Sequence, residues 1–158
     1  MNQSDLKMIA TTIIDSNMYM VLGTVDETGN PWVAPVYYAS ARYSEFYWVS
    51  SPEAMHSRNI ARHPQISIVI FNSQARIGTG QGVYMSAFAT QLSGVELDQG
   101  IEIFSRTSLR HGASAWKRED VQENAMYRLY RSYVSEHWIL DPAGHPDHRI
   151  SVNMSDNT

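Results

Sequence analysis

Short runs of apolar and β-branched residues recur along the chain and predict strands separated by turns. The run MYMVLGTV at 18–25 is followed by the turn sequence DETGN and by the run WVAPVYYA at 32–39. Pro35 lies inside the second run and cannot donate a backbone hydrogen bond, which predicts a sheet edge or a bulge there. The same pattern predicts further strands at 46–50, 65–72, 82–91, 127–140 and 148–153.

Apolar residues at helical spacing predict helices between these strands. The first covers residues 4–15, and the second runs from Pro52 to Arg62 with Ser51 as its N-cap. Two more follow later in the chain: one opened by the capping-box pair Ser93 and Glu96, and a short one at 119–126.

The order of these elements predicts an α+β fold in one domain that covers residues 1–158. The most economical arrangement is a small closed or half-open barrel of at least six strands, many of them antiparallel, with helices outside. Strict alternation along 127–140 places Tyr130 and Trp138 on one face of the last long strand, and His137 and Ile139 on the other.

Composition narrows the class of protein. The 158 residues are 43% hydrophobic and 18% charged, which is typical of a globular domain. The net charge of -4 argues against nucleic acid or an anionic membrane as the main partner. Cysteine is absent, which excludes disulfides and thiolate catalysis. No apolar run approaches the roughly 18 residues of a membrane span, and no signal peptide is recognisable, so a cytoplasmic protein is expected.

The richest candidate chemistry lies where the aromatic strand at 46–50 meets the second helix. The start of a helix leaves backbone N–H groups free and carries the positive end of the helix dipole, so anions bind there readily. Ser50 and Ser51 add hydroxyl groups, and His56, Ser57 and Arg58 add donors one turn further on. The segment predicts a ligand with a flat ring and a phosphate tail, or else an ordinary capped turn that binds nothing.

Other clusters of polar residues give weaker signals. His145, Asp147 and His148 lie in a turn rich in Pro and Gly, and no metal site is predicted there. The sequence GTGQG at 78–82 lacks the Lys-Ser/Thr of a phosphate-binding P-loop and precedes a strand, which predicts a plain loop. A serine nucleophile would need a base held by a third group, and the sequence identifies none.

Four segments in the same order resemble the pyridoxamine 5'-phosphate oxidase-like family of FMN-binding split β-barrels. They are MVLGTVDETGNPWVAPVYYA, FYWVSSPEAMHSRNIARHPQISIVIF, GQGVYMSAFATQL, and RLYRSYVSEHWILDP together with DHRISV. The resemblance implies an antiparallel, Greek-key-like split barrel with flanking helices. It also implies a homodimer with the cofactor at the subunit interface.

The resemblance assigns cofactor contacts position by position. The strand along the isoalloxazine edge corresponds to Val33, Ala34, Pro35 and Val36, and the approach to the ribityl chain and phosphate corresponds to Val49, Ser50 and Ser51. The family has a glutamine that faces the flavin ring. Strict counting along the chain places Gly82 at that position, and Gln81 is the residue next to it. Trp138 and Arg149 resemble a tryptophan and an arginine that reach the cofactor from the partner subunit.

The phosphate clamp departs from the family pattern. In the family the clamp is a basic pair, and its arginine and lysine positions fall on Met55 and His56 here. The charge of a histidine depends on pH in the neutral range, whereas a lysine stays charged there. Arg58 and Ser57 are the residues that could compensate. Ala34 stands where counting places an arginine of the true oxidases, which argues against oxidation of vitamin B6.

Two functions of different class follow from the resemblance. The first is an FMN-dependent oxidoreductase that transfers a hydride or electrons to or from an unidentified small molecule, with the protein orienting the ring. The second is a non-catalytic protein on the same fold that binds flavin or haem. Relatives that bind deazaflavin or haem make both groups alternatives to FMN.

Overall fold

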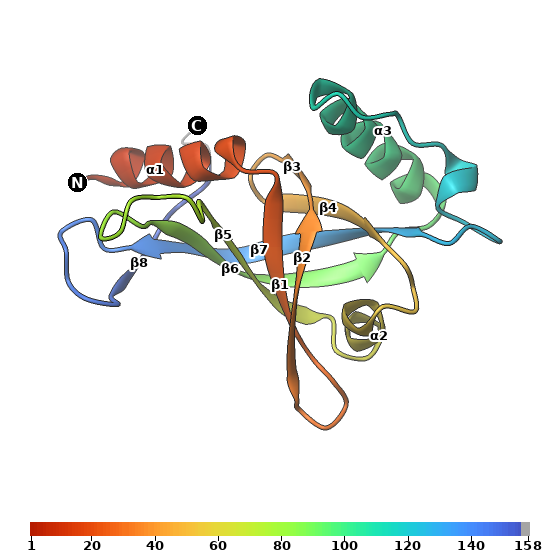
Figure 1. Cartoon of the computed structure of the whole chain (residues 1–158), viewed down its shortest axis with the longest axis horizontal. Helices are drawn as coiled ribbons and strands as arrows, with labels where there is room; N and C mark the ends of the chain where they lie inside the picture. Colours follow the sequence, from red (N-terminus) through yellow and green to blue (C-terminus); the bar gives the residue numbers. More distant parts are fainter. Residues whose placement is uncertain (156–158) are drawn as a thin grey trace.

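The computed structural model describes residues 1–155 and is built on one curled antiparallel sheet (Figure 1). Its strands follow the order β2-β1-β5-β6-β7-β4-β3, and β8 pairs with β7 beside this path. The α+β split-barrel fold predicted from the sequence is therefore confirmed. The strands are β1 (Tyr19–Val25), β2 (Pro31–Tyr37), β3 (Ala39–Ala41), β4 (Glu45–Ser50), β5 (Gln65–Phe71), β6 (Gly82–Gln91), β7 (Arg128–Leu140) and β8 (Arg149–Ser151).

Three α-helices lie against this sheet. The first covers the barrel along one side, the second lies at the lower end against β1, β2 and β6, and the third stands over β3 and β4 (Figure 1). In the described residues no helix is long and apolar enough to cross a membrane. The helices are α1 (Gln3–Ser16), α2 (Met55–Arg62) and α3 (Gly94–Arg110), with a short 3-10 turn η1 (Arg118–Asp120).

The predicted start of the second helix was wrong, and the capping box predicted for the third is not formed. Ser51 is not the N-cap of α2, because its carbonyl and hydroxyl oxygens accept hydrogen bonds from the amides of Ala54 and Glu53 and make a separate turn. The helix begins at Met55 instead of Pro52, with Ala54 as its N-cap. At α3, Ser93 is the N-cap as predicted, but its side chain makes no cap bond, and Glu96 pairs with Arg131 of β7 instead of completing a capping box.

Two further predictions were also wrong. The strand predicted over 32–39 is divided, because the chain leaves β2 after Tyr37 and begins β3 at Ala39. A tight turn with positive φ at Arg42 and Tyr43 then leads into β4. The helix predicted over 119–126 is reduced to the single turn η1.

A bulge in β7 overturns the predicted alternation of that strand. Ser86 of β6 pairs with Glu136 and Ala87 pairs with Val134, so Ser135 is an extra residue. Tyr130 therefore faces the barrel core, whereas Trp138 faces outward and His137 and Ile139 are buried. The sequence predicted Tyr130 and Trp138 on one face, and the inserted residue separates them.

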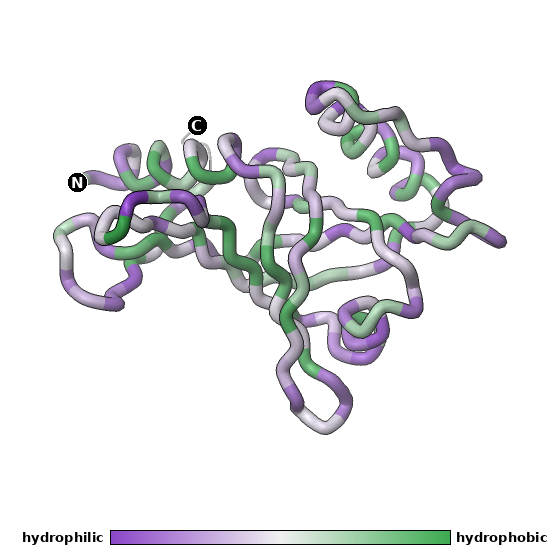
Figure 2. The backbone as a smooth tube through the Cα atoms, in the orientation of Figure 1, coloured by the Kyte–Doolittle hydropathy of each residue, from purple (hydrophilic) through white to green (hydrophobic). Residues whose placement is uncertain are grey.

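The buried apolar side chains form two clusters on opposite sides of β4. Hydrophobic residues concentrate along the strands and the inner faces of α1 and α3 in Figure 2. The first cluster fills the barrel beneath α1 and includes Trp48, which stacks on Tyr130 at 5.7 Å between ring centroids. The second lies under α3 and includes Tyr47 and Phe104.

Gly100 allows α3 to lie close to the sheet. A Cβ atom at this position would lie 2.6 Å from Leu92 Cδ1, 3.0 Å from Leu129 Cδ2 and 3.3 Å from Tyr47 Cε1. A side chain here would force the buried side chains of Leu92 and Leu129 to move.

We expect Gly100→Val to lower the free energy of unfolding by about 2 to 3 kcal/mol, because the added methyl groups overpack this contact. Chemical denaturation measures the change. Val95→Ala, at a position of α3 that is 72% exposed, is the control and should change stability by less than about 0.5 kcal/mol. If valine at 100 stabilised the protein, as helix propensity alone would predict, the close packing of α3 would be refuted.

Candidate functional site

The sheet is split between β2 and β4, and α2 closes the lower end of the split (Figure 1). Two contacts tie α2 to the β1–β2 hairpin. The amide of Asn59 donates a buried hydrogen bond of 3.0 Å to Thr24 Oγ1 of β1, and Arg62 pairs with Glu27 in the hairpin loop. The first turn of α2 is thereby held beside the edge strand β2 and the end of β4.

His56 and Ser50 meet at this junction. Nε2 of His56 lies 2.8 Å from Oγ of Ser50, which is the last residue of β4 and is buried. Burial lowers the pKa of His56 below its ordinary value, so the imidazole is neutral at pH 7. The pair offers hydrogen bonds to a ligand but no permanent positive charge.

Strand β2 supplies an unpaired sheet edge to the same region. Within residues 1–155 it pairs with β1 alone, which confirms the edge predicted from Pro35. Its side chains alternate, so the four predicted ring contacts are divided between two faces. Val33 and Pro35 are exposed on the outer face, while Ala34 and Val36 face the interior.

Two of the other predicted residues have structural roles. Val49 packs against the apolar cluster under α3, on the side of β4 away from the barrel core. Ser51 lies in the turn before α2 and accepts the amide of Glu53 with its hydroxyl oxygen at 3.1 Å. The backbone between Ser51 and Met55 leads directly from β4 into the first turn of α2.

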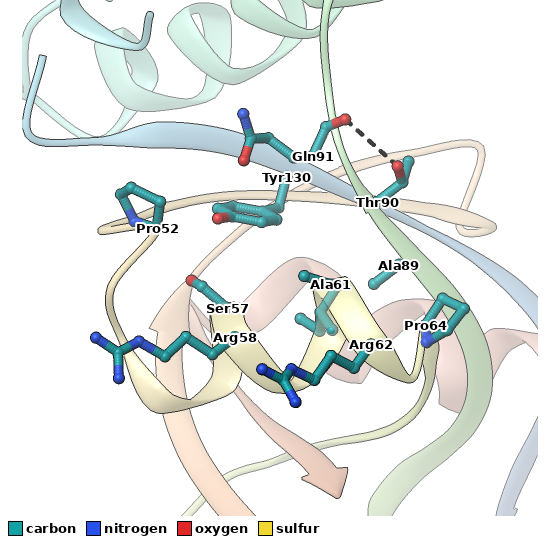
Figure 3. Close-up of a pocket in the computed structure, with 11 residues that line it drawn as sticks. Pro52, Ser57, Arg58, Ala61, Arg62, Pro64, Ala89, Thr90, Gln91 and Tyr130 are labelled. Atoms are coloured by element: carbon teal, nitrogen blue, oxygen red, sulfur yellow. Dashed lines mark hydrogen bonds between the residues drawn. The ribbon is translucent and has the colours of Figure 1, made fainter. Parts of the chain in front are cut away.

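Ser57 and Arg58 line a cavity of about 700 Å³ between α2, the end of β6 and Tyr130 (Figure 3). In Figure 3 the hydroxyl of Ser57 points from the helix toward the Tyr130 ring. His56 is not among the residues that line this cavity. The predicted phosphate donors are therefore not all directed to one place.

Gln81, Trp138 and Arg149 lie together at the opposite end of the sheet. The amide of Gln81 donates to the carbonyl of Leu140 at 2.9 Å and accepts its N–H at 2.8 Å, which clamps β6 to β7. Trp138 and Arg149 line an outer cavity of about 590 Å³. Arg149 lies 4.1 Å above the centroid of the Tyr84 ring there.

This second group is far from the junction at α2 within one chain. Ser50 pairs with Arg128, and Trp138 lies ten residues further along the same strand. At about 3.3 Å per residue the separation is roughly 30 Å along β7. The candidates therefore form two groups, with the first at the split and the second on the outer face of β6, β7 and β8.

Sequence reasoning missed several residues that shape these regions. Asn59 and Thr24 carried no recognisable motif, because their contact joins segments 35 residues apart. Tyr130 and Trp138 were predicted on one face of β7, and the extra residue Ser135 between them places them on opposite faces. The small residues Gly23, Ser67 and Ser86 line the outer cavity in one row across three strands. Small residues within strands were the only signal for this row.

Solved structures with the same fold are named for the binding of different cofactors. A haem-binding protein from Mycobacterium smegmatis matches with a TM-score of 0.71 at 18% identity, over 98% of this chain and 59% of that one. HutZ, the haem storage protein from Vibrio cholerae, gives 0.63 at 18% over 82% and 90%. An FAD-binding protein from Mesorhizobium loti gives 0.63 at 16% over 84% and 91%. At these identities the likeness shows the fold alone.

The chain spans less than two thirds of the Mycobacterium protein that it matches. Comparison with curated protein sequences finds no match. The family model for pyridoxamine 5'-phosphate oxidase matches residues 9–137, which include β1 to β6 and most of β7. The match covers well over half of the sequence and agrees with the split barrel, so the chain belongs to the pyridoxamine 5'-phosphate oxidase family.

Proposed function

We propose that the protein binds FMN at the split between β2 and α2 and exchanges a hydride or electrons between the flavin and a small molecule. The observation that carries this proposal is the pair of His56 and Ser50, 2.8 Å apart, beside the free edge of β2. In a chain of this family, the pair occupies the end of the barrel where α2 meets the sheet.

The donor set fits a phosphate group without a permanent cation. Ser50 supplies a hydroxyl group and His56 an imidazole that is neutral at pH 7. Ala34 on β2 contributes no charge. Neutral donors bind phosphate more weakly than a lysine or arginine does, so FMN is held as a dissociable cofactor whose affinity depends on pH.

Bound FMN supplies hydride or single-electron transfer, and the protein positions it. The edge of β2 borders the flavin ring, with Val33 and Pro35 on one side of the strand and Ala34 and Val36 on the other. Ser50 and His56 hold the phosphate, and the tie between Asn59 and Thr24 keeps α2 in place for that contact.

A homodimer completes the site in this proposal. Trp138 and Arg149 lie about 30 Å along β7 from the His56 junction, so within one chain they are far from a phosphate held at that junction. Their outer cavity includes the exposed Val33 of β2. A two-fold partner that packed on this face would bring its own Trp138 and Arg149 toward the flavin.

A second candidate is a haem-binding protein without catalytic activity. Two solved structures of the same fold are named for haem binding or haem storage. The absence of a permanent positive charge at Met55 and His56, the two clamp positions, favours this alternative over a phosphate-bearing cofactor.

The absorption spectrum of the purified protein separates the two candidates. We expect flavin bands after addition of FMN and rapid desalting, bleached by a nicotinamide donor under anaerobic conditions. A parallel sample mixed with haem is the comparison. A stable Soret band together with complete loss of FMN would overturn the oxidoreductase proposal and leave the haem-binding function.

The His56→Lys variant tests the phosphate contact directly. A lysine is charged throughout the neutral range, so we expect about tenfold tighter FMN binding at pH 7.5, measured by quenching of flavin fluorescence. Gln99→Lys, at an exposed position of α3, adds the same charge away from the site and is the control. Equal affinity in all three proteins would remove His56 from the phosphate site.

The affinity of the unmodified protein for FMN should rise as the pH falls. Burial keeps the pKa of His56 below its ordinary value, and a phosphate favours the charged imidazole, so protonation and binding promote each other. We expect the FMN dissociation constant to decrease between about pH 8 and pH 6.5, where the phosphate remains mostly dianionic. The His56→Lys substitution should abolish this dependence; an unchanged pH profile in that variant would assign the dependence to another group.

A further inference from the structure

We propose that the cavity between α2, the end of β6 and Tyr130 is a second ligand site, for a small organic anion with a flat apolar body and a carboxylate or phosphate group. This cavity has a volume of about 700 Å³ (Figure 3). His56, the residue of the proposed flavin site on α2, is not part of its wall. The inference goes beyond the proposed flavin function and does not depend on it.

The wall of the cavity is mainly apolar. Tyr130 is 3% exposed and stacks on Trp48, which is completely buried. Its ring is thereby fixed in orientation and forms a rigid wall above α2 in Figure 3. Such walls accept a flat ring or chain better than a hydrated ion. The remaining apolar side chains of the lining are Pro52, Ile60, Ala61, Pro64 and Ala89.

Ser57 supplies an unsatisfied polar group at the inner end. Its residue is 3% exposed, and its Oγ atom has no hydrogen-bond partner in the described part of the chain. In Figure 3 this hydroxyl is directed toward the ring of Tyr130, across the inner end of the cavity. A buried hydroxyl without a partner is costly, and a ligand oxygen between α2 and Tyr130 would satisfy it.

Two arginines give the mouth of the cavity its preference for anions. Arg58 and Arg62 are one turn apart on α2 and both line the cavity. In Figure 3 their guanidinium groups lie on the same side of the helix. Each is paired with a carboxylate, Arg58 with Glu53 and Arg62 with Glu27.

These ion pairs can be exchanged for a ligand. The four side chains are between 60% and 76% exposed, and ion pairs in such positions contribute little to stability. A guanidinium group can therefore turn from its carboxylate to an anion in the cavity at small cost. The polar groups at the mouth and at the inner end suit a ligand that carries oxygen atoms at more than one point.

Calorimetric titration of the full chain with phenyl phosphate and with benzoate tests this site. We expect saturable binding of at least one of them, at least tenfold tighter than that of inorganic phosphate, because the ring fills the apolar part of the cavity. Benzylammonium, which has a similar ring and the opposite charge, should not bind. Equal binding of benzylammonium would overturn the proposal.

Three variants locate the binding. Arg62→Gln should weaken it at least fivefold, Ser57→Ala about threefold, and Ala61→Leu should abolish it by filling the cavity. Arg106→Gln is the matched control, since Arg106 is equally exposed and paired with Glu102 on α3, away from the cavity. If Arg62→Gln and Ser57→Ala bound the probe as the unmodified protein does, the site would be refuted.

Competition distinguishes this site from the proposed flavin site. The probe should bind with the same affinity in the presence of excess FMN, and Ala61→Leu should leave the affinity for FMN unchanged. Displacement of the probe by FMN would refute the proposal that the two sites are separate. Failure of FMN to bind at all would refute only the flavin proposal.

Discussion

Strand β7 is the element on which the rest of the structure depends, because β6, β4 and β8 all form hydrogen bonds with it. The first half of β7 lies between β4 and β6, and its second half lies between β6 and β8. The extra residue Ser135 reverses the side-chain alternation between these halves. Tyr130 is therefore directed to the barrel core and the α2 cavity, and Trp138 to the outer face. One inserted residue separates two regions of candidate binding chemistry.

The position of α2 is the second constraint, and it connects the fold with both proposed sites. The hydrogen bond between Asn59 and Thr24 is buried, so loss of either partner would leave the other polar group unsatisfied. This bond fixes the rotation of the helix about its axis. His56 then faces the end of β4, while Ser57 faces Tyr130. Because successive residues of a helix are about 100° apart, one short helix can serve two different sites.

The family pattern and the chemistry of this chain differ at the phosphate position. A methionine and a neutral imidazole, Met55 and His56, stand where the resemblance implied two positive charges, and the compensating Arg58 lines another cavity. Sequence comparison finds the barrel, because its strand pattern and turns persist at low identity. It cannot assign the cofactor, because that depends on a few polar groups whose positions vary within the same fold.

The sequence by itself determined the split barrel, the edge character of β2 at Pro35, and the junction of β4 with a helix. These features depend on local periodicity and on the absence of a proline N–H, both of which can be seen in the chain. Only the tertiary structure decided the direction of Tyr130 and Trp138, the late start of α2 and the clamp of Gln81 on Leu140. The directions of Tyr130 and Trp138 and the clamp of Gln81 depend on hydrogen-bond partners from distant segments, and the late start of α2 depends on a competing turn at Ser51. The spacing of residues in the sequence does not encode these partners.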